Sequence, residues 1–182
     1  MCKQLLRKDI YLRKLEIKDA EAMFEWMNDH DICEKMQTDF SKYSIEDCVN
    51  FIMNSWDDEN NYNYAVTNSK GEYFGTVSLK NIDRKNSNAE FAIVLCQRAI
   101  GTGIATTTLF HIMNNAFKIL NLHKVYLYVR SDNKRAISFY KKNNLIYEGR
   151  FKEHLCIDGE YKDIEWFSLT LEEYEKWIEN YK

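Results

Sequence analysis

AEFAIVLCQRAIGTGIATTTLFHIMNNAFKILNLHKVYLYVRSDNKRAISFYKKNNLIYEG, residues 89–149, is the stretch that decides the fold of this chain. Its apolar run at 89–95 predicts a strand, and apolar residues at three- and four-residue spacing predict a helix over about 103–120. A second strand follows at 124–129, rich in β-branched and aromatic residues, and 134–143 form the next helix. Because strand, helix and strand in this order make a crossover unit, we expect the two strands to be parallel neighbours.

The turn between the first strand and the helix contains two glycines, Gly101 and Gly103. A glycine turn at a helix N-terminus presents free backbone N–H groups and the positive end of the helix dipole, which suit a phosphate or pyrophosphate. A Rossmann site would need a third glycine and a Walker loop would need Gly-Lys-Ser/Thr, and neither is present here. The pair predicts a phosphate ligand outside these nucleotide motifs, with an ordinary turn as the alternative.

The rest of the chain adds more strands and helices. Asp19 can cap a helix that runs to about residue 29, Ser44 begins a helix to about residue 56, and Thr170 opens a final helix. Because no linker or internal repeat is visible, the sequence predicts one α/β domain over 1–182 with a mixed sheet. Alternating or aromatic-rich runs predict the remaining strands at 10–17, 62–67, 73–81, 147–156 and 161–169.

The composition is that of an ordinary globular protein, with 182 residues, 45% hydrophobic, 29% charged and a net charge of −3. Since there is no basic excess, we expect no nucleic-acid partner, and the mild acidity is compatible with a cationic amine ligand. No signal-peptide pattern and no apolar run of about 18 residues occurs, so we expect a cytoplasmic protein without a membrane partner. The cysteines and histidines lack metal-ligand spacing, so no metal is expected.

Taken together, these segments resemble the GNAT superfamily of acyl-CoA N-acyltransferases, in particular the branch of ribosomal-protein N-terminal, spermidine and amino-sugar acetyltransferases. The resemblance covers essentially the whole chain and depends on the order and spacing of its segments. It implies an α/β (α+β) fold over 1–182, with a mixed, mostly antiparallel seven-stranded sheet flanked by helices and a central strand-helix-strand crossover. The segments that carry it are 89–91, 101–106, 120–125, 133–142, 147–149 and 158–163.

The resemblance implies acetyl-CoA as the co-substrate. The family's phosphate loop reads Gln/Arg-x-x-Gly-x-Gly/Ala, and two registers fit here, one beginning at Arg98 and one placing Ile100 where Gln or Arg is expected. Strand backbone would bind the pantetheine arm, and the turn amides would bind the pyrophosphate. The implied coenzyme-binding residues are Ile93, Val94, Leu95, Arg98, Ile100, Gly101, Thr102, Gly103, Ile104, Ala105, Asn133 and Tyr140.

Two residues are implied as catalytic. Tyr140, seven residues after Asn133 as in the family, would be the general acid that returns a proton to the leaving thiolate, because a phenol has a pKa of about 10. Glu90 would be the base, directly or through a water molecule, and would also border the acceptor. The alternatives are a packed tyrosine, a carboxylate that faces solvent or pairs with arginine, and an Asn133 that only caps its helix.

The acceptor site is expected at the first helix, near Trp26 and Asn28, although Trp26 is more readily explained as a core residue. We predict transfer of an acetyl group from acetyl-CoA to a primary amine of a small molecule, by direct attack in a ternary complex. An amino sugar ranks slightly before the polyamine spermidine. The alternatives are a protein N-terminal acetyltransferase and a non-catalytic acyl-CoA-binding protein, and a homo-oligomer is left open.

Overall fold

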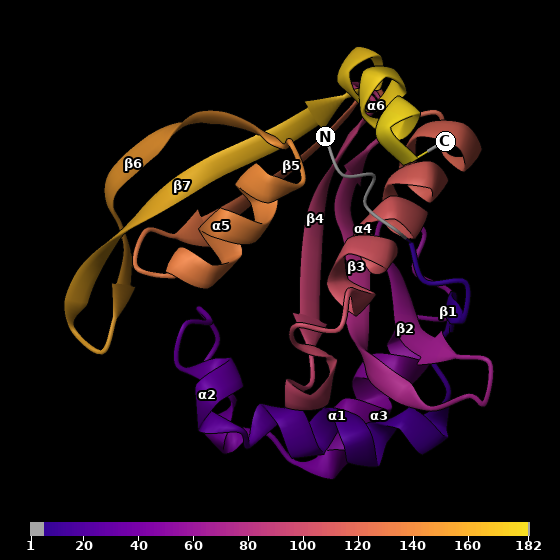
Figure 1. Cartoon of the computed structure of the whole chain (residues 1–182). Coiled ribbons are helices and arrows are strands. Elements are labelled where there is room, and N and C mark those ends of the chain that lie inside the picture. The colour runs from indigo at the N-terminus through magenta and orange to yellow at the C-terminus, as the bar shows by residue number, and fades with distance from the viewer. Residues whose placement is uncertain (1–5, 182) are drawn as a thin grey trace.

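The computed structural model describes residues 6–181 and contains one seven-stranded sheet (Figure 1). Neighbouring strands are antiparallel except β4 and β5, which are parallel. The predicted mixed, mostly antiparallel sheet with one parallel crossover pair is therefore confirmed. In spatial order the strands are β1 (Ile10–Lys14), β2 (Tyr62–Asn68), β3 (Tyr73–Asp83), β4 (Asn88–Leu95), β5 (Lys124–Arg130), β7 (Glu160–Thr170) and β6 (Ile146–Ile157).

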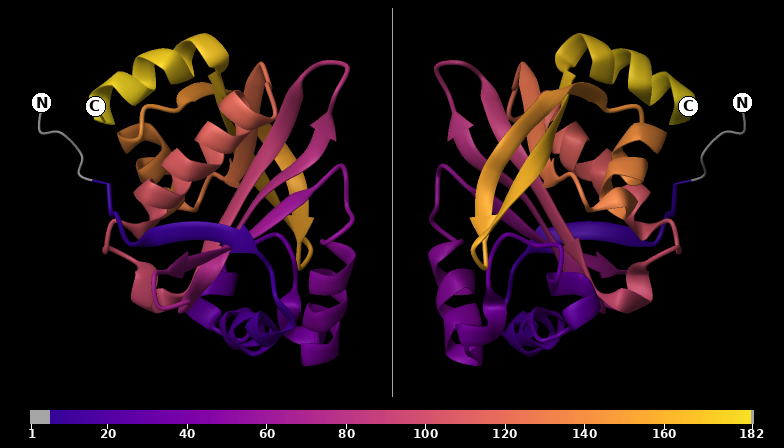
Figure 2. Two further views of the ribbon diagram at one scale, coloured as in Figure 1. Left: turned by 90° about the vertical axis from the view of Figure 1, so that its right-hand side faces the viewer. Right: turned by 90° about the vertical axis from the view of Figure 1, so that its left-hand side faces the viewer.

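Helices pack on both faces of the sheet (Figure 2). They are α1 (Ala20–Met27), α2 (His30–Cys33), α3 (Ile45–Asn54), α4 (Ile104–Asn114), α5 (Lys134–Lys142) and α6 (Leu171–Ile178). The helix predicted over 103–120 is α4 together with a π-helical turn at Asn115–Ile119 that continues it. None of the helices within residues 6–181 has the length and apolar character needed to cross a membrane.

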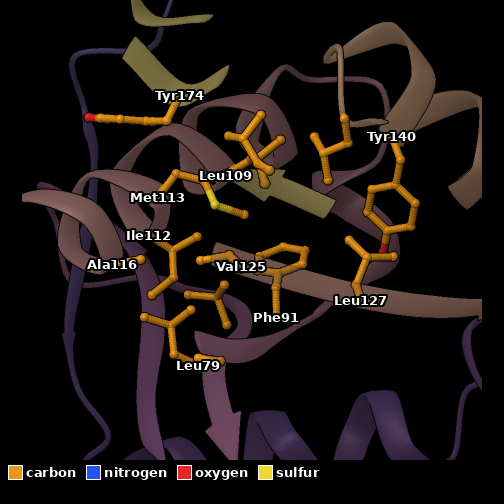
Figure 3. Packing of buried hydrophobic residues seen from close by; sticks show 14 of the residues in the cluster. Leu79, Phe91, Leu109, Ile112, Met113, Ala116, Val125, Leu127, Tyr140 and Tyr174 are labelled. Carbon is orange, nitrogen blue, oxygen red and sulfur yellow. The ribbon is translucent and has the colours of Figure 1, made fainter. Parts of the chain in front are cut away.

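The larger hydrophobic core lies between the sheet and α4, α5 and α6 (Figure 3). Alternate strand residues point to one face of a sheet, and Leu79, Phe91 and Leu127 face this core from β3, β4 and β5. Ile112 and Met113 of α4 are fully buried against them. Each such side chain contributes roughly 1.5–3 kcal/mol by burial. This packing fixes α4 against the sheet and so positions the glycine turn that precedes it.

The smaller core lies on the opposite face of the sheet, where α1 and α3 are side by side at one end of the molecule (Figure 1). Met23 and Trp26 of α1 pack with Ile52 of α3 and with Ala65 and Tyr73 of the sheet. Trp26 is only 4% exposed. The core interpretation of Trp26 is therefore confirmed.

The entry into α1 differs from the sequence prediction. Asp19 precedes α1 without capping it by its side chain. Its carboxylate instead accepts two hydrogen bonds of 2.7 Å from the Arg13 guanidinium and one of 2.8 Å from the Glu16 backbone N–H. Because Asp19 is 2% exposed, it needs such a cationic partner. The strand predicted over 10–17 ends early, since the chain turns into a short 3₁₀ helix at Ile17–Asp19.

Candidate active site

The parallel strands β4 and β5 separate after a short paired segment. Within the described chain they are in register only over 88–90 and 124–126. β4 then continues through Ile93, Val94 and Leu95, which pair with β3 on the other side, while β5 leans away with β7 (Figure 1). Backbone groups of these three residues that point toward β5 are therefore available to an extended ligand in the gap.

The turn at the end of β4 carries free backbone donors. Gly101 and Gly103 have φ angles of 76° and 83°, which favour glycine, and Gly103 immediately precedes α4. The N–H groups of Gly101, Gly103, Ala105 and Thr106 donate to no acceptor among residues 6–181. The segment 97–106 also contains no carboxylate. Free donors at the positive end of α4, without a competing negative charge, suit a diphosphate.

Arg98 and Ile100 are the two candidates for the first position of the phosphate loop, and their side chains have different surroundings. The Arg98 guanidinium turns toward β3, where it donates to the Tyr73 carbonyl at 2.5 Å. It also lies 3.3 Å from the Glu72 carboxylate and 5.6 Å from the centroid of the Phe74 ring. Ile100 is 37% exposed and offers no donor. In this arrangement the backbone, more than either side chain, provides the donors of the loop.

Tyr140 of α5 reaches into the larger core beside the gap (Figure 3). Its ring is edge-on to Phe91 of β4, with centroids 6.4 Å apart, and lies 5.7 Å from Phe167 of β7. Tyr140 is buried, and this burial raises the pKa of its phenol. Its hydroxyl makes no hydrogen bond within the described chain. The phenol therefore stays protonated and has a hydroxyl that is free to donate.

Asn133 immediately precedes α5 and caps it. Its side-chain oxygen accepts a hydrogen bond of 3.1 Å from the Ala136 N–H. This bond satisfies one of the donors that a helix start leaves free and fixes the first turn of α5. Tyr140 follows about two turns later, so the same cap orients the tyrosine.

Glu90 leaves β4 on the face opposite to Phe91, at the point where β4 and β5 begin to separate. Its Oε1 is 2.8 Å from the Lys80 ammonium, and its Oε2 accepts a hydrogen bond of 2.9 Å from the Asn81 amide. Glu90 thus forms an ion pair, as one alternative predicted, but its partner is a lysine and not an arginine. Each carboxylate oxygen retains a lone pair that can accept from water or an amine. Tyr140 and Glu90 therefore approach β4 from opposite faces.

A cavity of about 440 Å³ opens between the end of α1, the segment after α2 and the turn that joins β6 to β7. Asn28 lines it, with its amide donating to the Phe24 carbonyl at 2.8 Å. Trp26 instead borders a smaller cavity of about 200 Å³. Across residues 6–181, no three His, Cys, Asp or Glu side chains are grouped to hold a metal ion. The carboxylates that line the larger cavity belong to Asp29, Glu34, Asp39 and Asp158.

Arg130, the last residue of β5, was missed by the sequence prediction although it lines the larger cavity. It is 6% exposed and donates to the carbonyls of Glu34 and Met36 at 3.0 and 3.3 Å. Asp132 accepts from two other nitrogens of the same guanidinium. Arg130 thereby ties the cavity wall after α2 to the strand that borders the gap. No sequence pattern indicated this link, because its partners are 94 and 96 residues away.

The chain is similar in sequence to known acetyltransferases. A family model described as an acetyltransferase (GNAT) domain matches residues 9–145. A spermidine N(1)-acetyltransferase of Vibrio cholerae is 33% identical over 101 residues, which cover 56% of this chain and 58% of that protein. The chain thus spans little more than half the length of this relative. The acetyltransferase PseH of Campylobacter jejuni is 27% identical over 131 residues, or 72% of this chain and 79% of that protein.

The structural similarity extends over nearly the whole chain. One of the matching structures is a crystal structure of spermidine N-acetyltransferase from Vibrio cholerae in complex with CoA and spermine. It has a TM-score of 0.85 at 25% identity and covers 93% of this chain and 99% of that chain.

Proposed function

The chain belongs to the acetyltransferase (GNAT) family, and on this premise we propose that it transfers the acetyl group of acetyl-CoA to a primary amine of a small molecule. The observation that carries the proposal is the gap between β4 and β5, which has Tyr140 on one face of β4 and Glu90 on the other. A non-catalytic coenzyme-binding protein would need neither a free phenol nor a carboxylate at this place.

The described residues fit the coenzyme. Backbone groups of Ile93, Val94 and Leu95 would bind the pantetheine arm in the gap. The free N–H groups of the turn at 101–106 would bind the diphosphate, and Asn133 would add a side-chain donor. Acetyl-CoA itself supplies the activated acetyl group and a thiolate leaving group. The other predicted coenzyme contacts belong to the same turn, where the buried Ile104 would contribute its backbone alone: Arg98, Ile100, Thr102, Ile104 and Ala105.

Glu90 and Tyr140 divide the proton transfers between them. In direct attack, the amine nitrogen forms a bond to the acetyl carbon and the carbon–sulfur bond breaks. Glu90 would accept the proton that the attacking amine loses, directly or through one water, and Tyr140 would donate a proton to the departing sulfur. Because the two side chains approach from opposite faces, acceptor and coenzyme would enter from opposite sides. Holding them in this geometry itself lowers the barrier.

The larger cavity favours a cationic acceptor over an anionic one. It is lined by four carboxylates, whereas Arg130, its buried cation, is already paired with Asp132. A nucleotide-linked sugar would bring phosphates against this acidic wall, and an oligoamine would be attracted to it. We therefore rank an oligoamine such as spermidine before an amino sugar, which reverses the order suggested by the sequence. The spermidine acetyltransferase similarity supports the same ranking.

Thermal unfolding and a thiol-release assay test the two halves of this proposal. At about one hundred times its Kd, acetyl-CoA should stabilise the protein by about 2.7 kcal/mol and raise Tm, and adenosine should not reproduce the rise. Release of coenzyme A thiol is then followed with spermidine, an amino sugar and a peptide with a free N-terminus. No Tm rise at millimolar acetyl-CoA contradicts the coenzyme site. Thiol release with the peptide alone would favour the protein N-terminal alternative.

Replacing Arg130 by lysine should raise the KM for the amine about tenfold. A lysine keeps the charge but cannot form the forked contacts to two carbonyls and Asp132. Losing one or two such bonds costs about 1.4 kcal/mol, which is a factor of about ten. The Tm rise with acetyl-CoA should stay unchanged. As a matched control, Arg150→Lys alters an exposed pair with Asp163 and should change neither value. Weaker acetyl-CoA binding in R130K would contradict this role.

A further inference from the structure

Four aromatic side chains form a stripe across the half of the sheet that leans away from β4. This aromatic stripe consists of Tyr126 and Tyr128 of β5, Trp166 of β7 and Phe151 of β6. Tyr128 and Trp166 are register partners, with ring centroids 5.0 Å apart. The rings of Tyr126 and Phe151 lie 5.8 and 5.4 Å from that of Trp166. None of the four belongs to either hydrophobic core of the described chain.

The aromatic stripe is partly open to solvent. Tyr126, Tyr128 and Trp166 are half-buried, and Phe151 is 50% exposed. Exposed apolar area of this kind does not stabilise the fold, and contiguous patches commonly mark binding surfaces. Aromatic faces carry negative electrostatic potential, so a stripe of stacked rings is a suitable surface for a cation.

The stripe adjoins a carboxylate at one end. Glu90 and Tyr126 are register partners in the parallel pair, so both side chains leave the sheet on the same face. Burial and, after it, the Glu90 carboxylate raise the pKa of both Tyr126 and Tyr128. The negative charge is therefore close enough to act on both rings. Lys80 already places one ammonium 2.8 Å from Glu90, which shows the kind of group that this carboxylate accepts.

The other end of the stripe reaches the larger cavity. Arg130 follows Tyr128 by two residues, faces the same side of β5 and lines the cavity. Since a strand rises about 3.3 Å per residue, roughly 13 Å separate Tyr126 from Arg130 along β5. Glu90 lies beside Tyr126 at one end of this path, and the four carboxylates of the cavity lie around the other end. The surface therefore suits a long molecule with cationic groups at intervals.

We propose that the aromatic stripe is the acceptor-binding surface, which holds the cationic body of the amine over Tyr126 and Tyr128 and directs the reacting nitrogen to Glu90. The Trp166 ring lies beside both tyrosine rings on the same face and adds a third aromatic face to this surface. A phosphate-bearing acceptor is disfavoured on this surface, because carboxylates lie at both of its ends. The inference deepens the proposed function and rests on it, since it assigns the side of the sheet from which the amine arrives.

Two substitutions and a paired control test the stripe. Tyr128→Leu and Trp166→Leu should each raise the KM for spermidine by roughly 3- to 30-fold, the range expected for one cation–π contact. Their kcat at saturating spermidine and their Tm rise with acetyl-CoA should stay as in the original protein. Tyr128→Phe keeps the ring, so its KM for spermidine should stay within about threefold of the original value. Tyr161→Leu removes a 68% exposed aromatic from the opposite face of β7 and should change nothing.

Binding measured without turnover separates this inference from the proposed function. Spermidine is titrated calorimetrically into each variant in the absence of acetyl-CoA. Binding that is weakened in Y128L and W166L supports the stripe even if no amine is acetylated. An unchanged KM and an unchanged Kd in both leucine variants would overturn it. The inference would also be overturned if either variant changed the oligomeric state in size-exclusion chromatography without changing amine binding. The stripe would then be an interface between copies of the chain.

Discussion

Replacing Tyr140 by phenylalanine should lower kcat by about 100- to 10,000-fold, the range attributed to one general acid. The substitution removes only a hydroxyl that makes no hydrogen bond within the described chain, so the packing against Phe91 and Phe167 should remain. Because burial raises the pKa of Tyr140, its phenol is fully protonated at neutral pH. The loss should therefore appear in kcat at every neutral or mildly alkaline pH, in steady-state assays with saturating acetyl-CoA.

Two comparisons make this experiment decisive. The Tm rise with acetyl-CoA should be the same in Y140F as in the original protein, which separates a chemical defect from a binding defect. Tyr174→Phe is the matched control, since Tyr174 is a buried tyrosine of the same core whose hydroxyl bonds to Asn114 at 3.2 Å. It should cost about 1 kcal/mol of stability and leave kcat unchanged. A kcat for Y140F within about threefold of the original would remove Tyr140 from the mechanism.

Replacing Gly75 by alanine should lower the free energy of unfolding by about 3 kcal/mol and weaken acetyl-CoA binding at the same time. Gly75 has a φ angle of 150°, and a Cβ there would lie 2.1 Å from the Val94 carbonyl oxygen and 2.8 Å from the Leu95 Cα. Both contacts are with the backbone of β4, which cannot move aside without shifting the strand at the gap. The two effects are read from denaturant unfolding and from the Tm rise with acetyl-CoA.

Gly71→Ala separates the steric effect from the general cost of replacing a glycine. Gly71 has a φ angle of 78°, but a Cβ there would have no atom within 4 Å. Its replacement should cost about 1 kcal/mol through backbone conformation alone and should not alter acetyl-CoA binding. If both variants lost the same free energy of unfolding and the same affinity for acetyl-CoA, the close approach of β3 to β4 would have no role in shaping the gap.

The sequence predicted those parts of the fold that depend on local patterns. Alternation and helical spacing identified the crossover around β4, α4 and β5, as confirmed by their parallel pairing. Ser44 and Thr170 were predicted as helix starts, and each accepts a hydrogen bond from the backbone N–H three residues later. Asp19 was misjudged, because a guanidinium on β1 competes with the helix start for its carboxylate.

The proposed acceptor surface could not be predicted in the same way, because its parts meet only through strand order and long-range contacts. Tyr128 faces Trp166 only because β7 lies between β5 and β6, an order that periodicity does not determine. Arg130 reaches its carbonyl partners across 94 and 96 residues of chain. The roles of Tyr140 and Glu90 came from resemblance to a family, and they remain predictions that the kinetic experiments above address.

The gap between β4 and β5 also bears on aggregation. A free strand edge exposes unpaired N–H and C=O groups and invites pairing with a strand of another molecule. At one of the two outer edges of this sheet, β6 has an irregular register between Phe151 and Leu155, which interrupts such pairing. The inner edge of β4 is protected by its surroundings instead, since Tyr140 and α5 lie on one face and three strands, β5, β7 and β6, lie across the gap. The molecule can thus keep a strand edge ready for its ligand without offering it to its neighbours.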